Sequence, residues 1–368
     1  MRCDKIIKII EDWAPKSIAW EKDNVGLQVG SLRREVKNIL LCLDIDEKVV
    51  AEAVKKNCNL IISHHPLLFK SLERIDTEKD KTSRILEKLI KKEITLYSAH
   101  TNLDFTKDGV SFQLAKKLGL TNQKFLLNLS SNQNKLVVFV PVTHTEKVAE
   151  AMYTAGAGII GEYTNCSFRT LGTGTFKGSE KSNPTIGLKG KVEKVDEVKI
   201  EVSVNSFDLK KVIAEMKKAH PYEEVAYDVY PLANENINYG MGVIGNLKKG
   251  LSEKEFLSLV SKSLDLKNFR FNHTKKSRIN KVAVCGGSGS NLLDAALISG
   301  ADALVTADVK YHTFQDADNC ILLIDAGHYE TEIHSLNEVK NRIEKSITDK
   351  IKVYKYKGST NPIVFYNN

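Results

Sequence analysis

Four histidines of this sequence follow short apolar runs, at points where a strand would end. His64 and His65 are adjacent and precede Pro66, whereas His100 and His328 each close a separate run. One imidazole at the end of a strand is an ordinary polar residue. Two consecutive imidazoles beside a proline, which interrupts secondary structure, are better explained by a ligand that binds both. Imidazole is the commonest metal ligand in proteins.

Carboxylates accompany two of these histidines, each four residues further along the chain. Asp104 follows His100, and Glu332 follows His328. A helix that begins at His328 would place His328 and Glu332 on one face, whereas a loop after His100 leaves the geometry there open. Imidazole and carboxylate without thiolate suit Zn, Fe, Mn, Co or Ni, and they argue against a structural cysteine-type zinc site.

The adjacency of His64 and His65 favours two metal ions over one. Neighbouring residues of a regular strand point to opposite faces, so each imidazole would meet a different ion. Two ions about 3.5–4 Å apart form the centre of many hydrolytic enzymes. A further pair with the same spacing, Asp308 and His312, follows another apolar run and is expected at the same rim.

Each of these residues also has a structural interpretation. A single histidine at a strand end usually bonds to the chain, and a glutamate at a helix start favours the helix dipole. The occurrence of such residues after several successive runs favours metal binding. The glycine-rich stretch 285–291 lies between a predicted strand and a predicted helix. It lacks the lysine of a phosphate-binding loop, so we interpret it as a tight turn rather than an anion site.

The segments around these residues alternate between apolar runs and helical patterns. Residues 38–120 contain three run-and-helix pairs, and residues 281–347 repeat the plan. Strands that are apolar throughout and separated by helices predict parallel sheets covered on both faces. Ligands bind at the carboxyl ends of such strands, where the histidines lie. We therefore predict an α/β fold in which two similar halves form a discontinuous core.

A different pattern lies between the two halves. Residues 128–134 are polar and predict a linker, and residues 234–238 predict an exit loop. Between them the pattern is β-α-β-β-α-β, the ferredoxin-like order. The predicted domains are a first core half at 1–130, an inserted ferredoxin-like α+β domain at 135–233, and a second core half at 238–368.

The composition is that of a soluble globular protein with room for two or three domains in its 368 residues. The net charge of +8 is spread along the chain, so nucleic-acid binding is a poor explanation of it. The six cysteines form no Cys-X-X-Cys pair, as expected of buried thiols in a reducing compartment. Without a signal-peptide pattern or an apolar run of about 18 residues, we expect a cytoplasmic protein that spans no membrane.

Six stretches, in order, resemble the dinuclear-metal-centre family of GTP cyclohydrolase 1 type 2 homologs. They are "DNVGLQVG", "LIISHHPLLFK", "AHTNLD", "VAVCGGSGSNLL", "GADALVTADVKYH" and "LIDAGHYETE". The middle segment, with "GTGTFKGSE" and "HPYEEVAYD", is similar to the insert of the family's longer bacterial members. That insert in turn resembles the CutA and PII proteins.

The resemblance implies two similar α/β halves, a toroidal homohexamer and two divalent metal ions in the cleft between the halves. It assigns the metal ligands to five residues, namely His64, His65, Asp104, His328 and Glu332. Glu332 would be the bridging carboxylate. His100 and His312 match family positions near the metals, where they would support the ligands or transfer protons.

The candidate ligands and the family resemblance together allow three functions. The leading hypothesis is a metal-dependent hydrolase that acts on a nucleotide-like or heterocyclic small molecule, with GTP ring opening as the variant that the family name suggests. The alternatives without turnover are a metal chaperone or storage protein, and a regulatory ring in which the insert senses a small ligand. Fold and metals alone do not decide the substrate.

Overall fold

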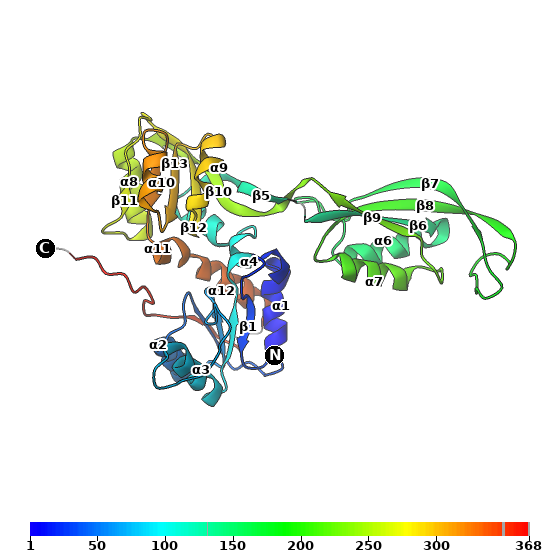
Figure 1. The fold of residues 1–368 in the computed structure, drawn as a ribbon, viewed down its shortest axis with the longest axis horizontal. Helices are drawn as coiled ribbons and strands as arrows, with labels where there is room; N and C mark the ends of the chain where they lie inside the picture. Colours follow the sequence, from blue (N-terminus) through cyan, green and yellow to red (C-terminus); the bar gives the residue numbers. More distant parts are fainter. Residues whose placement is uncertain (131, 348–349, 367–368) are drawn as a thin grey trace. The chain divides into compact units, whose positions relative to one another are not determined.

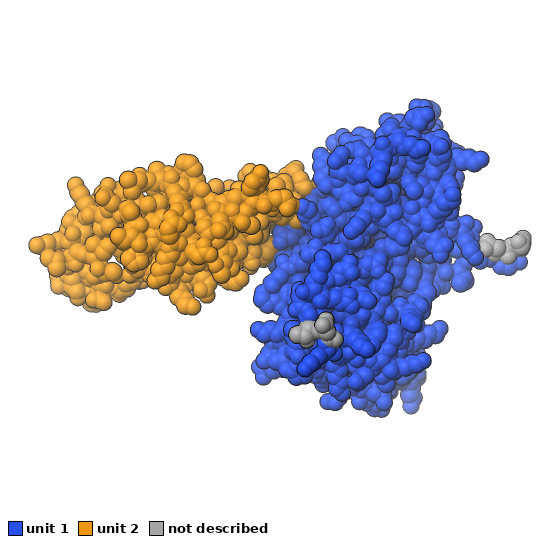
Figure 2. Space-filling model, turned by 180° about the vertical axis from the view of Figure 1, so that it is seen from behind, with its two compact units in different colours: residues 1–127, 239–368 blue, residues 128–238 orange. Residues whose placement is uncertain are grey.

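The computed structural model describes residues 1–130, 132–347 and 350–366. The chain forms two compact units (Figure 2). Unit 1 combines residues 1–127 with 239–368, and unit 2 comprises residues 128–238. Within the described ranges, no helix has the length and apolar character needed to cross a membrane. The histidines and carboxylates singled out above all belong to unit 1.

The first sheet of unit 1, whose strand β1 is labelled in Figure 1, has the strand order β1-β4-β3-β2-β15. Its strands are β1 (Gly26–Val29), β2 (Ile39–Cys42), β3 (Leu60–Ser63), β4 (Thr95–Ser98) and β15 (Val353–Lys355). β2, β3 and β4 are parallel and fully buried, as their apolar sequences predict, and β1 is antiparallel to β4. The covering helices are α2 (Glu47–Lys55) and α3 (Lys81–Lys91) on one face, and α1 (Cys3–Trp13) and α12 (Ser335–Ser346) on the other.

The second sheet of unit 1 has the order β11-β14-β13-β12-β10-β5. Its strands are β5 (Thr121–Ser130), β10 (Glu235–Leu251), β11 (Arg270–Phe271), β12 (Ile279–Ser288), β13 (Ala303–Ala307) and β14 (Leu322–Asp325). β12, β13 and β14 are parallel, and β11 is antiparallel to β14. The covering helices are α5 (Val110–Lys117) and α8 (Glu253–Leu264) on one face, and α9 (Leu293–Ile298) and α10 (Tyr311–Ala317) on the other.

The two sheets of unit 1 share one plan and exchange elements. Each has three consecutive parallel strands in the same order, with an antiparallel strand beyond the last of them, and the first sheet adds β15 as a fourth parallel strand beside β2. However, β5 and α5 precede the insert and join the second sheet, whereas β15 and α12 lie near the C-terminus and join the first. The sequence pattern missed this exchange, because an apolar run does not reveal which sheet it enters.

Unit 2 has the β-α-β-β-α-β order of a ferredoxin-like domain. Its elements are β6 (Gln133–Pro141), α6 (Thr145–Thr154), β7 (Ser167–Lys177), β8 (Val192–Asn205), α7 (Leu209–Ala219) and β9 (Tyr227–Leu232). The sheet order is β7-β8-β6-β9, with antiparallel neighbours. Both helices cover the same face of this sheet (Figure 1).

The predicted linker at 128–134 and exit loop at 234–238 are mostly strand. β5 runs to Ser130, β6 begins at Gln133 and β10 begins at Glu235, while residue 131 lies outside the described residues. The prediction of loops was wrong because it rested on polar side chains. Strand formation here depends on backbone pairing with neighbouring strands, which polar side chains do not prevent.

Candidate metal centre

The candidate ligands of unit 1 lie where its parallel strands end. His64 and His65 come directly after β3, and His100 follows β4 and precedes the short helix α4 (Thr101–Asp104). His328 begins helix α11 (His328–Glu332), which follows β14. The predicted sharing of a helix face by His328 and Glu332 is confirmed, since His328 Nε2 lies 3.1 Å from Glu332 Oε1.

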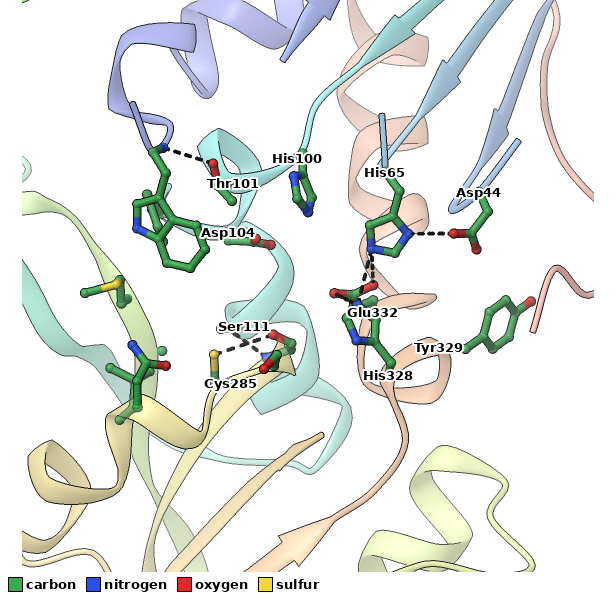
Figure 3. Close-up of a pocket in the computed structure, with 18 of the residues that line it drawn as sticks. Asp44, His65, His100, Thr101, Asp104, Ser111, Cys285, His328, Tyr329 and Glu332 are labelled. Atoms are coloured by element: carbon green, nitrogen blue, oxygen red, sulfur yellow. Dashed lines mark hydrogen bonds and ion pairs between the residues drawn. The ribbon is translucent and has the colours of Figure 1, made fainter. Parts of the chain in front are cut away.

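His64 and His65 face one cluster, not opposite sides of a sheet. β3 ends at Ser63, so both residues lie beyond the regular strand and the alternation rule no longer applies to them. The ring nitrogens of His64, His65 and His100 lie within 4.8 Å of one another. Those of His65 and His328 form a second group with a Glu332 oxygen, so His65 belongs to both (Figure 3).

The Glu332 carboxylate lies between three imidazoles. Oε1 is 3.1 Å from His328 Nε2 and 3.6 Å from His64 Nε2, and Oε2 is 3.2 Å from His65 Nε2. The side chain is only 3% exposed. Asp104 Oδ1 lies 3.6 Å from the same His64 Nε2 atom. The position of Glu332 between these imidazoles suits a carboxylate that bridges two ions.

All four imidazoles are fixed through Nδ1, which donates to an oxygen of the chain. The acceptors are the Ala99 carbonyl for His64 (2.8 Å), Asp44 for His65 (2.8 Å), Asp23 for His100 (2.9 Å) and Asp308 for His328 (2.6 Å). In the neutral ring this tautomer leaves Nε2 with a lone pair that a metal can use. A ring that donates through one nitrogen to a carboxylate or carbonyl and offers the other is typical of metal-binding histidines.

Two of these supporting carboxylates were missed by the sequence reasoning. Asp44 follows β2 and was therefore detectable as one more carboxylate at the end of a strand. Asp23 lies before β1, and its contact with His100 spans 77 residues. The signal for Asp23 was only its place in the motif "DNVGLQVG". The Thr101 hydroxyl and backbone N–H also donate to Asp23. Burial alone would raise the pKa of Asp23, but the hydrogen bonds from His100 and Thr101 outweigh it and lower that pKa to about 2.

The residues fit a bound metal on two grounds. His65 Nε2 and His328 Nε2 face each other at 3.3 Å, although both atoms are acceptors in the neutral rings and both are donors in the protonated rings. Among the described residues, His64 Nε2, Asp104 Oδ1 and Glu332 Oε2 are buried and lack a well-aligned hydrogen bond. Ligand atoms about 2.1 Å from one tetrahedral ion lie roughly 3.4 Å apart. The separations of 3.1–3.6 Å around Glu332 match that spacing.

The charges in this cluster are strongly coupled in the absence of metal. Burial alone would lower the imidazole pKa values, but Asp44 and Glu332 raise the pKa of His65 to about 10. Glu332 and Asp308 likewise outweigh burial and raise the pKa of His328 to about 9. Burial favours a raised pKa for Glu332, yet the surrounding imidazoles hold it well below its usual range. Protons thus supply positive charge that metal cations would otherwise provide.

The glycine-rich stretch 285–291, predicted to be a tight turn, is strand over its first four residues, because pairing with β13 extends β12 through Ser288. Within it, Gly287 has a φ of +63°. A Cβ atom at Gly287 would lie 2.3 Å from Glu332 Oε1 and 3.2 Å from His328 Nε2, so only glycine leaves room there. The nearby Cys285 thiol has a pKa raised to about 12, chiefly by burial, and stays protonated in the metal-free chain.

A cavity of about 540 Å³ opens beside the cluster. Its wall includes His65, His100, Asp104, His328 and Glu332, together with the aromatic residues Trp20, Phe69, Phe105 and Tyr329. His312 does not line it. That residue is exposed in α10 and its Nδ1 bonds to Gln315 (2.9 Å), so the structure does not bring it to the other predicted site residues.

Comparisons with known proteins agree with this architecture. The sequence matches the family Duf34/NIF3 (NGG1p interacting factor 3) over residues 1–362. It is 44% identical over 347 residues to the GTP cyclohydrolase 1 type 2 homolog of Halalkalibacterium halodurans, covering 94% of this chain and 93% of that protein. The protein of the same name from Bacillus subtilis is 39% identical over 366 residues, or 98% of each chain.

Solved structures show the same fold. The Bacillus cereus protein related to NIF3 gives a TM-score of 0.86 at 39% identity and covers 100% of this chain and 99% of its own. The Staphylococcus aureus protein SA1388 gives 0.77 at 29% identity with the same coverage. On sequence and structure together, this chain belongs to the Duf34/NIF3 family.

Proposed function

We propose that this chain holds two divalent transition-metal ions and hydrolyses a small heterocyclic, nucleotide-like molecule. The observation that carries the proposal is the Glu332 carboxylate between three imidazole Nε2 atoms. The proposed ligands are those of the family resemblance, namely His64, His65, Asp104, His328 and Glu332. Such ions would supply an activated water and polarise the substrate.

The wall of the cavity supports a planar substrate. Trp20 and Phe105 pack edge to face, with ring centroids 5.5 Å apart, and Phe69 lies against His100 at 6.0 Å. Trp20 is 55% exposed and Phe69 61% exposed, which is a large aromatic surface to leave in water. A volume of about 540 Å³ suits a nucleotide-sized ligand. The aromatic side chains would bind a heterocycle by stacking.

His100 is the residue best placed to move a proton. Its Nδ1 is held by Asp23, and its ring lies 5.3 Å from that of His64 and 5.4 Å from that of His65. Its Nε2 atom, which accepts a proton in this tautomer, belongs to a residue that lines the cavity. We propose that His100 exchanges a proton with the substrate at Nε2.

Turnover by the metal-loaded chain tests this proposal. The substrate panel would include GTP, for which ring opening releases formate, since relatives carry the name GTP cyclohydrolase 1 type 2 homolog. Glu332→Gln is the inactive control. Binding is followed separately by quenching of Trp20 fluorescence in a Trp13→Phe background, which leaves Trp20 as the sole tryptophan.

Turnover in the wild type that is absent in Glu332→Gln supports a hydrolase. Tight metal binding without turnover across nucleotides and phosphoesters would contradict it and favour metal storage or delivery. The homohexamer implied by the family resemblance is part of the proposal. Light scattering of the purified chain, whose mass is 41.1 kDa, tests it by the mass of the assembly.

A further inference from the structure

The last part of unit 1 crosses the rim of the metal cavity. Between β15 and residue 366, the last that the structure describes, the chain forms no helix or strand, yet Asn361, Pro362 and Ile363 line the cavity. A local turn fixes its shape, because the Asn361 N–H donates to Ser359 Oγ (3.1 Å) and the Ile363 N–H donates to Asn361 Oδ1 (3.0 Å). We call residues 359–363 the C-terminal strap.

The strap bonds to the carboxylate that orients His65. The Thr360 hydroxyl donates to Asp44 Oδ2 (2.8 Å), while Asp44 Oδ1 accepts from His65 Nδ1 (2.8 Å). The same arrangement occurs at His100, where the Thr101 hydroxyl donates to the second oxygen of Asp23.

The two carboxylates differ in their surroundings. The Asp23 side chain is 7% exposed and that of Asp44 is 43% exposed. A half-exposed carboxylate is free to rotate unless something holds its second oxygen. At Asp44 the hydroxyl that does so belongs to a residue 316 positions away along the chain.

The strap also bonds to the opposite side of the metal cluster. Asn361 Nδ2 donates to Glu330 Oε1 (2.8 Å), and Glu330 belongs to α11, the helix that carries His328 and Glu332. The strap therefore joins the strand end at Asp44 to the helix of the bridging carboxylate.

We propose that the C-terminal strap completes the metal centre, with Thr360 as a positioning residue that holds His65 through Asp44. Asn361 fastens the strap to α11, and Pro362 and Ile363 cover part of the cavity. The ion bound by His65 and His328 is then released more slowly than it would be without the strap. This inference rests on the proposed metal centre and adds to it the residues that govern metal retention.

The test is the rate of metal release from the full chain loaded with Co²⁺. An excess of EDTA is added, and the loss of visible Co²⁺ absorption is followed. Thr360→Val removes the hydroxyl at nearly constant shape. Loss of a direct partner of a metal-binding histidine costs about 10- to 100-fold in affinity, and Thr360 acts one hydrogen bond further away, so we expect one ion to be released about 10-fold faster. The Co²⁺ spectrum should shift as well. Thr360→Ser keeps the hydroxyl and should restore both.

Three variants complete the design. Asp44→Asn directly weakens the hydrogen bond between Asp44 and His65, and it should accelerate metal release at least as much as Thr360→Val does. Removal of residues 359–368, which lie beyond β15, should accelerate it too. Val364→Ala changes a residue that is 89% exposed and should release Co²⁺ at the wild-type rate.

Two results would overturn the inference in distinguishable ways. In the first, Thr360→Val and the truncated chain release Co²⁺ at the wild-type rate, whereas Asp44→Asn releases it faster. This result would show that the strap does not position His65. The metal centre itself would stand in that case. A wild-type chain that takes up no Co²⁺ would remove the metal centre, and the strap's role with it.

Discussion

The two ends of the candidate metal centre are held in different ways. At one end the His64 side chain is 0% exposed, and a backbone carbonyl, that of Ala99, accepts its Nδ1 hydrogen bond. At the other end His328 is 34% exposed, and its acceptor is Asp308, a side chain that is 48% exposed. A main-chain acceptor in the core cannot turn away, whereas an exposed carboxylate can rotate and is screened by water.

This difference predicts a division of labour between the buried end at His64 and the open end at His328. The buried end should retain its ion, and the open end should exchange its ion more readily. Glu332 contacts both ends, so changes to it should affect both ions. Changes at a single end should affect one.

Glu332→Gln should have the largest effect, because it removes the carboxylate shared by both ends. We expect both ions to be lost. The metal-free variant should also be less stable by about 3–5 kcal/mol, since the imidazoles lose their buried partner. Elemental mass spectrometry and urea unfolding at pH 7 measure the two effects. The control is Glu344→Gln, at an exposed ion pair with Lys340, and retention of both ions by Glu332→Gln would contradict the account.

His328→Ala and the kinetics of chelation should distinguish the two ends. His328→Ala should leave about one ion per chain, held at the buried end. In the wild type, EDTA should remove metal in two phases of equal size, and His328→Ala should show only the slow phase. A single phase in the wild type would mean that the ends are equivalent.

The stability of the metal-free chain should fall at alkaline pH. His65 and His328 have pKa values of about 10 and about 9 in the folded chain, against roughly 6.5 when unfolded. Their stabilising contribution is complete below pH ~6.5 and is lost as the pH rises through 9 to 10. Thermal unfolding followed by circular dichroism from pH 6 to 10 should show this decline. The metal-loaded chain, whose imidazoles are already neutral, should not show this decline. Equal pH profiles of stability for the two forms would refute the link between imidazole protonation and stability.

Gly287→Ala should weaken metal binding more than it weakens the fold. The added methyl group meets Glu332, and the left-handed backbone adds about 1 kcal/mol of strain. Gly300→Ala is the matched control, because Gly300 has a φ of +69° and nothing within 4 Å of the added carbon. Metal content should drop only in Gly287→Ala, while both variants should lose similar unfolding free energy from strain.

His312→Ala should have the smallest effect. Its side chain is exposed and bonds only within α10 as far as the described contacts show, so unfolding free energy should change by no more than about 0.5 kcal/mol. Metal content should stay at the wild-type value. His100→Ala is the comparison, and it should alter the Co²⁺ spectrum because its ring lies within the His64 and His65 group. A loss of metal in His312→Ala would contradict this prediction and show that His312 supports metal binding.

The sequence revealed much of this site because strand ends are visible in it. Apolar runs without alternation predicted β2, β3 and β4, and the polar residues after such runs included His64, His65 and His328. The i, i+4 pair of His328 and Glu332 needed only a helix that starts at once. These are local patterns, and local patterns are what a single sequence contains.

Long-range contacts were not predictable in this way. Asp23, Gly287 and Thr360 reach the cluster or its supports from distant segments, and no spacing rule connects them. The placement of His312 failed for a related reason. Spacing after an apolar run placed it at the rim, but α10 turns its side chain to solvent.

The central claim is that two ions share Glu332, and metal content per chain tests it most directly. The chain would be purified without chelator or tag and measured by elemental mass spectrometry beside Glu332→Gln. The account predicts about two transition-metal ions per wild-type chain and close to none in the variant. No metal in the wild type, even after incubation with Zn, Fe, Mn, Co or Ni, would contradict it, and the histidines would then have a purely structural role.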